Sequence, residues 1–254
     1  MSVRLTDAKG GKVSALPLER AGEESTVVGE ARGEITRQRI LDAAQRLFSE
    51  HGSNGVSLRT ITAEAGANSA AANYHFGSKK GLLEAVFARH ATGIAQEREA
   101  QLRDCRAEPG RPPLLEQIVR AFLEPGMRGQ HGGKGFARFR GRMLAENTDQ
   151  TRELYSRYFN DSTGQFLDAL QAALPDLSPH DLYWRFHVML GTMVYTLANP
   201  GRIQILSNGD CDSSDPGLAL DTLVPIIAQL FRNPAIPPVG GSETLHNINS
   251  IEAK

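Results

Sequence analysis

Apolar residues recur at intervals of three and four along most of this chain, and that spacing constrains the fold more than any other feature. The first run places its apolar side chains on one stripe of a helix, at Ile40, Leu41, Ala44, Leu47 and Phe48. No stretch alternates apolar and polar residues for long enough to build a sheet. The sequence therefore predicts an all-α protein.

Glycine, proline and capping residues divide the chain into segments. Residues 1–33 carry repeated glycines and no apolar period, so we expect a disordered arm there. Three helices are predicted within a domain of residues 34–80, and a long fourth helix runs from Ser78 to about Arg103. A second domain, residues 81–232, and a flexible tail, 233–254, follow. Further helices are expected at about 113–124, 136–147, 149–174, 178–198 and 216–232.

The overall composition excludes several classes of protein. With 254 residues, 40% of them hydrophobic and 22% charged, the chain has the makeup of a folded globular protein. The two cysteines, Cys105 and Cys211, lie far apart and fit neither a disulfide framework nor a metal-ligand spacing. The N-terminus lacks the apolar core of a signal peptide, and no apolar run is long enough to span a membrane. We therefore expect a cytoplasmic protein that does not act at a membrane.

Signatures of catalysis and metal binding are weak. The glycine-rich stretch 129–135 misses the spacing of a nucleotide-binding loop, and no Ser or Thr follows Lys134. The seven histidines form no ligand cluster, since neither His180 nor His187 has a Cys or a paired carboxylate close by in the sequence. We assign no catalytic residue, no metal site and no cofactor, and a helical enzyme is a less favoured alternative.

Residues 57–79 carry the spacing of a helix-turn-helix. Two short helices flank a tight turn at Gly66, and alanines in both helices allow them to pack closely. The second helix is poor in large apolar groups, and its polar side chains would project outward with a size and chemistry that the major groove of DNA admits. The alternative is an ordinary helical hairpin, in which Asn68 is only a cap and His75 only a packing residue.

Residues 34–90 resemble the N-terminal domain of the TetR family of prokaryotic transcription regulators. The matching positions are Thr36 to Ala44, Leu47-Phe48, His51-Gly52, Ile61, Ala65-Gly66, Tyr74 to Lys79 and Leu82-Leu83. The order Asn73-Tyr74-His75-Phe76 marks a subgroup of the family. The resemblance implies a homodimeric, ligand-released repressor whose two recognition helices enter successive major grooves of a palindromic operator.

The resemblance also implies roles for individual residues. Ser57 and Lys79 match positions that hold phosphates, and Tyr74 and His75 match positions that contact the DNA backbone. Base edges would be read from the remaining matched positions, which are Arg59, Asn68, Ser69, Ala70 and Asn73. Between residues 34 and 90 seven basic residues stand against five acidic ones, so tight binding requires two such modules in a dimer.

The C-terminal half contains a helix that is apolar on nearly every side, over 178–198, and a second apolar stripe over 216–232. The resemblance implies that these helices form a four-helix interface with a second copy, and burial within one protomer is the alternative. The long helix from Ser78 would connect this half to the DNA-binding domain as a lever. An effector could then change the spacing of the two DNA-binding modules.

An effector pocket is expected among the helices of the C-terminal half, lined by apolar and aromatic groups. The candidates are Phe136, Phe139, Arg140, Met143, Leu144, Trp184, His187, Val188, Gly191 and Tyr195, with plain core packing as the alternative for each. The runs 139–155 and 182–191 are similar to those of regulators that respond to fatty acids or acyl-CoA. A hydrophobic acid or its thioester is therefore the expected effector. The alternatives are an aromatic or multidrug-like effector, or an architectural DNA-binding protein with no effector.

Overall fold

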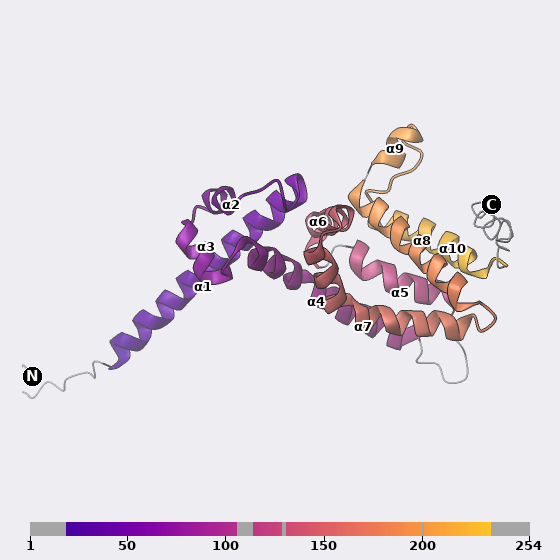
Figure 1. Ribbon diagram of the computed structural model, residues 1–254, viewed down its shortest axis with the longest axis horizontal. Coiled ribbons are helices and arrows are strands. Elements are labelled where there is room, and N and C mark those ends of the chain that lie inside the picture. The colour runs from indigo at the N-terminus through magenta and orange to yellow at the C-terminus, as the bar shows by residue number, and fades with distance from the viewer. Residues whose placement is uncertain (1–18, 106–113, 129–130, 200, 235–254) are drawn as a thin grey trace, which may run out of the picture.

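The computed structural model describes residues 19–105, 114–128, 131–199 and 201–234, and this part of the chain contains ten helices and no strand. The helices are α1 (Glu19–His51), α2 (Leu58–Glu64), α3 (Ser69–Phe76), α4 (Lys79–Cys105), α5 (Leu115–Met127), α6 (Gly133–Glu146), α7 (Asp149–Ala173), α8 (Pro179–Ala198), α9 (Arg202–Leu206) and α10 (Pro216–Arg232). Figure 1 shows α1, α2 and α3 at one end, a helical bundle at the other, and α4 running between them. The all-α prediction is confirmed.

Capping side chains explain why most predicted helix ends lie within a few residues of the observed ones. Ser57 accepts a hydrogen bond from a backbone N–H in the first turn of α2 at 3.0 Å, and Asn68 accepts one at the start of α3 at 2.7 Å. Ser178 caps α8 in the same way, at 3.1 Å. Each cap satisfies a backbone donor that has no partner inside its own helix.

The N-terminal segment differs from the predicted arm. Helix α1 begins at Glu19, so residues 19–33 are helical, and residues 1–18 lie outside the described part of the chain. Each glycine in 19–33 costs about 1 kcal/mol relative to alanine. Extending an existing helix needs no new nucleation step, however, and the Glu, Ala and Arg residues between the glycines favour helix. Of the predicted tail, only Asn233 and Pro234 are described.

Two features of the C-terminal half were not predicted. The short helix α9 lies in a stretch for which the sequence predicts no helix. Helix α5 continues to Met127 through Pro125, although its predicted end was near residue 124. A proline inside a helix removes one backbone hydrogen bond. In α5 the apolar face that includes Phe122 and Leu123 is fully buried, and this packing holds the helix together across the proline.

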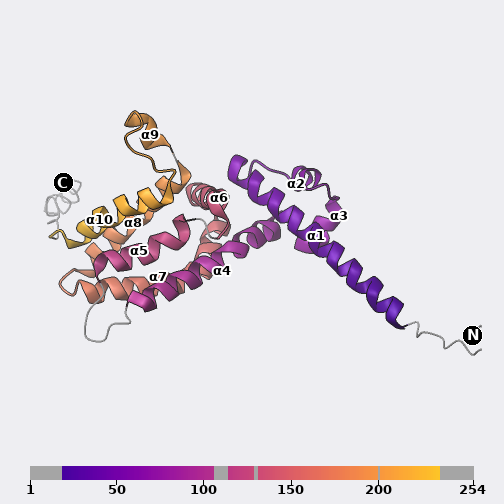
Figure 2. The ribbon, with the colours of Figure 1, turned by 180° about the vertical axis from the view of Figure 1, so that it is seen from behind.

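Two hydrophobic clusters hold the helices together. The first joins α1, α2 and α3 to α4, α6 and α7, and in it Phe48 stacks on Phe139 with ring centroids 6.1 Å apart. The second lies in the bundle, where Phe122 of α5 packs against Phe166 of α7 and Phe186 of α8. Helix α6 packs against α1 (Figure 2), so the N-terminal helices share their core with part of the C-terminal half. In the described residues, none of the helices is both long and apolar enough to cross a membrane.

Candidate nucleic-acid interface and interior cavity

The turn between α2 and α3 depends on Gly66. Its φ is +58°, in the left-handed region that residues with a side chain rarely adopt. A Cβ at this position would also meet a guanidinium nitrogen of Arg39 in α1. The N–H of Ala67 donates to the carbonyl of Thr62 at 2.8 Å and closes the turn. The two helices are therefore held at a fixed angle, with Ile61 buried beneath them.

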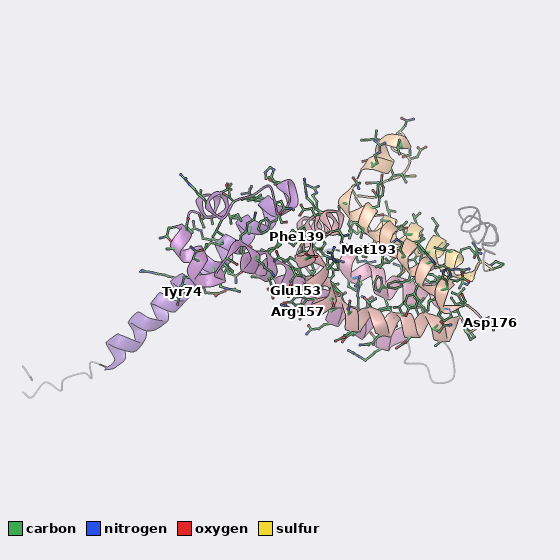
Figure 3. All side chains as sticks on the ribbon, in the orientation of Figure 1. Tyr74, Phe139, Glu153, Arg157, Asp176 and Met193 are labelled. Carbon is green, nitrogen blue, oxygen red and sulfur yellow. The ribbon has the colours of Figure 1, made fainter. Side chains whose placement is uncertain are left out.

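Helix α3 has one buried face and one exposed face. Ala72 is buried in the first hydrophobic cluster, and Phe76 lies under the Arg37 guanidinium group, 5.6 Å from its ring centroid. The exposed face carries Ser69, Ala70, Asn73 and Tyr74. Tyr74 is 86% exposed and lies on the outside of the N-terminal helices in Figure 3. No described residue covers this face, so its side chains are accessible to another molecule.

The other residues predicted to contact DNA have different surroundings. Arg59 is exposed, and its side chain makes no hydrogen bond with the described residues. The side-chain oxygens of Ser57 and Asn68 accept the capping hydrogen bonds of their helices. The amide NH2 of Asn68 therefore remains as a free donor. Lys79 is partly exposed at the start of α4. His75 is half-buried beside the Tyr74 ring, an arrangement that fits a packing residue.

The C-terminal half contains a cavity of about 570 Å³ between α4, α5, α6, α7 and α8. This volume is within the range of about 300–1,000 Å³ that small-molecule sites occupy. Five predicted residues line it: Arg140, Leu144, His187, Gly191 and Tyr195. The other five lie elsewhere. Phe136, Phe139 and Met143 are buried in the first hydrophobic cluster, and Trp184 and Val188 are exposed.

Several lining residues were missed by the sequence analysis. They include Phe122 of α5, Tyr155 and Phe159 of α7, and Met193 of α8. The most unexpected is Arg98 of α4, which is only 2% exposed. A signal for it exists in the sequence, because Arg98 falls on the buried stripe of α4 between Ile94 and Leu102.

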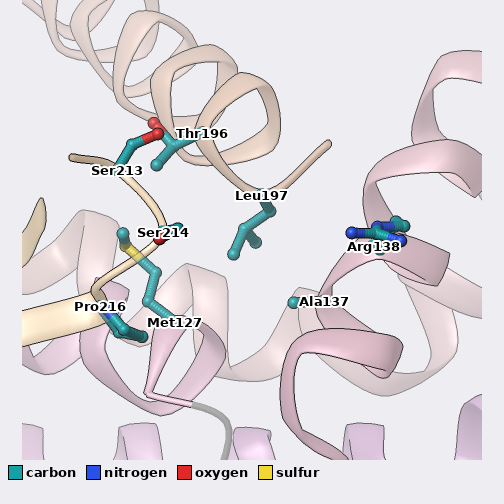
Figure 4. A pocket seen from close by; sticks show the side chains of 8 residues that line it. All are labelled: Met127, Ala137, Arg138, Thr196, Leu197, Ser213, Ser214 and Pro216. Atoms are coloured by element: carbon teal, nitrogen blue, oxygen red, sulfur yellow. The ribbon is translucent and has the colours of Figure 1, made fainter. Parts of the chain in front are cut away.

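Three other hollows are smaller or more polar. One of about 60 Å³ lies between α6, α8 and the start of α10 (Figure 4), and it has room for only a few water molecules. One of about 280 Å³ lies between α8, α10 and the residues that follow α9. A polar groove of about 460 Å³ runs between α1, α4 and α6, with Gln45, Arg46 and Arg138 in its walls. The 570 Å³ cavity therefore combines the largest volume with the most apolar lining of these four.

Both halves of the chain match known families. Residues 40–86 match the family described as bacterial regulatory proteins, tetR family, and residues 116–229 match the tetracyclin repressor-like C-terminal domain. This chain belongs to the TetR family. The relatives of this TetR-family protein include the probable HTH-type transcriptional regulator YttP of Bacillus subtilis, 28% identical over 48% of this chain and 57% of the relative. The transcriptional repressor AcnR of Corynebacterium glutamicum is 33% identical over 35% of this chain and 41% of the relative.

The matches thus span about half the length of these curated relatives. Solved structures extend the likeness to about four fifths of the TetR-family chain. The regulator PfmR of Thermus thermophilus has a TM-score of 0.56 at 18% identity, covering 79% of this chain and 97% of PfmR. The fatty acid degradation regulator FadR of Bacillus halodurans has a TM-score of 0.55 at 15% identity, covering 79% and 100%. At these identities the likeness shows the fold alone.

The TetR-family chain also leaves large apolar side chains in water on its last helices. Tyr183, Trp184 and Tyr195 of α8 are 56–61% exposed, and Ile226 of α10 is 60% exposed. Exposed apolar side chains extend to α9 with Ile205, which is 74% exposed. The described protomer therefore exposes large apolar side chains on each of α8, α9 and α10.

Proposed function

We propose that this protein is a DNA-binding transcription regulator, a ligand-released repressor that acts as a homodimer in the cytoplasm. The exposed face of α3 carries the proposal. It presents Ser69, Asn73 and Tyr74 on a rigid helix, and no described residue covers it. Polar side chains on a short exposed helix can reach the base edges in the major groove.

The structure supports a division of labour among the residues at this surface. Arg59 and Asn73 have free donors and reach outward from adjacent helices, so we assign them to base recognition. Ser57 immediately precedes α2, and Lys79 is the first residue of α4. We assign both to phosphate contacts, and we assign Tyr74 and the half-buried His75 to contacts with the DNA backbone beside them. The amide of Asn68 together with Ser69 and Ala70 would complete the surface that faces the bases.

The test is selection of operators from random DNA. Purified protein is incubated with a library of random duplexes, bound duplexes are amplified, and the binding of the enriched sequence is measured at several salt concentrations. We expect a palindromic sequence whose half-sites lie about 34–36 Å apart, and the logarithm of the association constant should fall linearly with the logarithm of the salt concentration. Retention of no duplex at low ionic strength would contradict the proposal.

We assign the apolar surface on α8, α9 and α10 to the dimer interface. Burial of Trp184, Val188 and Ile226 against a second copy would remove their apolar area from water at about 25 cal/mol per Å². Analytical ultracentrifugation should give a dimer at micromolar concentration, and Val188→Glu combined with Ile226→Glu should give a monomer. A wild-type protein that stays monomeric at that concentration would contradict the assignment.

The 570 Å³ cavity supports an effector site, as opposed to an architectural DNA-binding protein without an effector. Its aromatic and aliphatic walls favour a hydrophobic effector, and we propose a hydrophobic acid or its acyl-CoA thioester. Mass spectrometry of the protein before and after denaturation would reveal a co-purified molecule. An aromatic or multidrug-like compound bound there in place of an acid would refute the effector class but not the regulator.

A further inference from the structure

Two arginines are buried beside the cavity without an acidic partner. Arg98 of α4 is 2% exposed and Arg140 of α6 is 1% exposed, and both guanidinium groups lie within 5.4 Å of the centroid of the Phe159 ring. No carboxylate of the described residues forms an ion pair with either of them, and no Asp or Glu lines the cavity. A buried charge without a counterion is strongly disfavoured in proteins.

The hydrogen bonds of these arginines are incomplete. Arg98 donates through Nε to the carbonyl oxygen of Phe122 at 2.8 Å, and its guanidinium carbon lies 3.8 Å from the centroid of that ring. Its Nη2 reaches only the sulfur of Met193, a weak acceptor, at 3.8 Å. In Arg140 both Nε and Nη1 are buried and have no partner among the described residues. The site therefore offers unused donors and an unbalanced positive charge.

The guanidinium groups influence each other as well. Burial foremost, and the positive charge of Arg140 second, lower the pKa of Arg98 to about 9. Arg98 remains protonated at neutral pH at this value. Gly126 of α5 leaves the space for Arg140, because a Cβ there would lie 2.9 Å from Nη1. The fold thus accommodates the second buried cation in a place where a smaller apolar side chain would pack more easily.

We propose that Arg98 and Arg140 form an anion site in the cavity that binds the carboxylate of a hydrophobic acid, and that the effector is the free acid and not its thioester. The inference rests on the proposed function, because it names the ligand of the same effector cavity. A carboxylate accepts hydrogen bonds from both guanidinium groups and balances their charge, and its apolar chain lies against walls such as Leu144 and Val194. The carbonyl of a thioester is neutral, so a CoA thioester bound through this carbonyl, with its phosphates away from the arginines, would leave both buried charges uncompensated.

Isothermal titration calorimetry on the full chain tests this site. The ligands are octanoate, dodecanoate and hexadecanoate, each with its matching alcohol and its CoA thioester. We expect at least one acid to bind at least about ten-fold more tightly than its alcohol and its thioester. Equal affinities of the wild-type protein for acids and alcohols, or tighter binding of the thioesters, would already overturn the proposal.

Two variants then locate the anion. Arg140→Met keeps an unbranched apolar stem without the guanidinium group and should remove the preference for the acid, whereas Arg138→Met, a neighbouring exposed arginine outside the cavity wall, should keep it. Arg98→Met is the second cavity variant in case Arg140→Met does not fold. If Arg140 had only a structural role, its replacement would lower the thermal unfolding temperature. An uncompensated one should leave that temperature unchanged or raise it.

Failure of the anion site can be distinguished from failure of the proposed function as a DNA-binding regulator. Operator selection is carried out without ligand, so a protein that binds duplex DNA and yet shows no preference for acids refutes only the anion site. An acid preference that survives in both Arg140→Met and Arg98→Met would also refute it.

Discussion

Replacement of Arg185 gives the sharpest test of what holds the C-terminal bundle together. Arg185 lies on α8, is 8% exposed, and donates through Nη1 to the carbonyls of Leu230, Phe231 and Asn233 at 2.9, 2.6 and 2.7 Å. Its Nη2 donates to the carbonyl of Pro234 at 3.2 Å. Because α10 ends at Arg232, these carbonyls have no amide partner inside the helix. One side chain therefore satisfies two of the last carbonyls of α10 and the carbonyls of the two residues that follow the helix.

The expected loss in the free energy of unfolding follows from the number of N–H protons that the Arg185 guanidinium group donates. The Nη1 group has two hydrogens to share among three carbonyls, and Nη2 makes one further bond, so about three hydrogen bonds from a charged donor are lost in Arg185→Met, each worth about 1.5–3 kcal/mol. Water can replace part of this loss at Asn233, which is exposed. Removing the buried charge also returns part of its desolvation cost. We expect the free energy of unfolding to fall by about 3 kcal/mol.

Urea unfolding followed by circular dichroism measures this change, at one fixed protein concentration because a dimer's stability depends on concentration. Arg232→Ala is the matched control at the same end of α10, since Arg232 forms an exposed ion pair with Glu116. An exposed ion pair contributes about 0–1 kcal/mol. If Arg185→Met lost no more stability than Arg232→Ala, the capping argument would be wrong.

Three further predictions concern the DNA-binding end. In a DNA-binding titration, Arg59→Ala should weaken the binding free energy by about 1–3 kcal/mol and relax the base preference, whereas Lys79→Ala should weaken binding to all sequences alike. An unchanged base preference in Arg59→Ala would contradict the assignment of Arg59 to base reading. Gly66→Ala should lower stability by about 1–2 kcal/mol in thermal unfolding, because φ is +58° there. Burial is the main cause that lowers the pKa of His90 from 6.5 to about 4, so the free energy of unfolding should fall as the pH drops from 6.5 to about 4. Urea unfolding at each pH measures this decrease, and the decrease should be smaller in His90→Gln.

The helices were predictable because their ends are marked locally. Capping by Ser57, Asn68 and Ser178 depends on side chains one to three residues away, and the positive φ of Gly52 and Gly66 is a property of single residues. The start of α1 was not predictable in this way. Whether a glycine-containing segment continues a helix depends on a small balance between propensity and propagation, which no single residue marks.

The cavity was harder to predict because its walls depend on helix rotation. In α8 apolar residues fall on every side, so the sequence does not say which of them face the bundle. The structure buries Leu182, Phe186 and Met189 and turns Trp184 and Val188 to the surface, where the sequence analysis had placed both in the pocket. Arg98 was missed because a lone arginine in a long polar helix is usually exposed, and only its register indicates burial.

The two arginines of the anion site stand on the helices that reach the DNA-binding end. Arg98 lies on α4, which also carries the Arg89–Asp42 ion pair to α1 at 2.5 Å. Arg140 lies on α6, where Arg142 donates to the Glu50 carbonyl at 2.7 Å. We propose that a carboxylate held between α4 and α6 would draw together two helices that both contact α1, and that occupancy of the cavity would thereby change the position of α3.

Arg142→Ala should uncouple the two sites without removing either. We expect the apo protein to keep its operator affinity and its affinity for the acid, while the factor by which the acid weakens operator binding falls toward one. Linkage requires the operator to weaken acid binding by that same factor, so both titrations must change together. Arg120→Ala, which breaks an exposed ion pair to Asp221 between α5 and α10, is the control and should leave the factor unchanged. Full coupling in Arg142→Ala would show that α6 does not transmit the signal, and would leave α4 as the connection between the two sites.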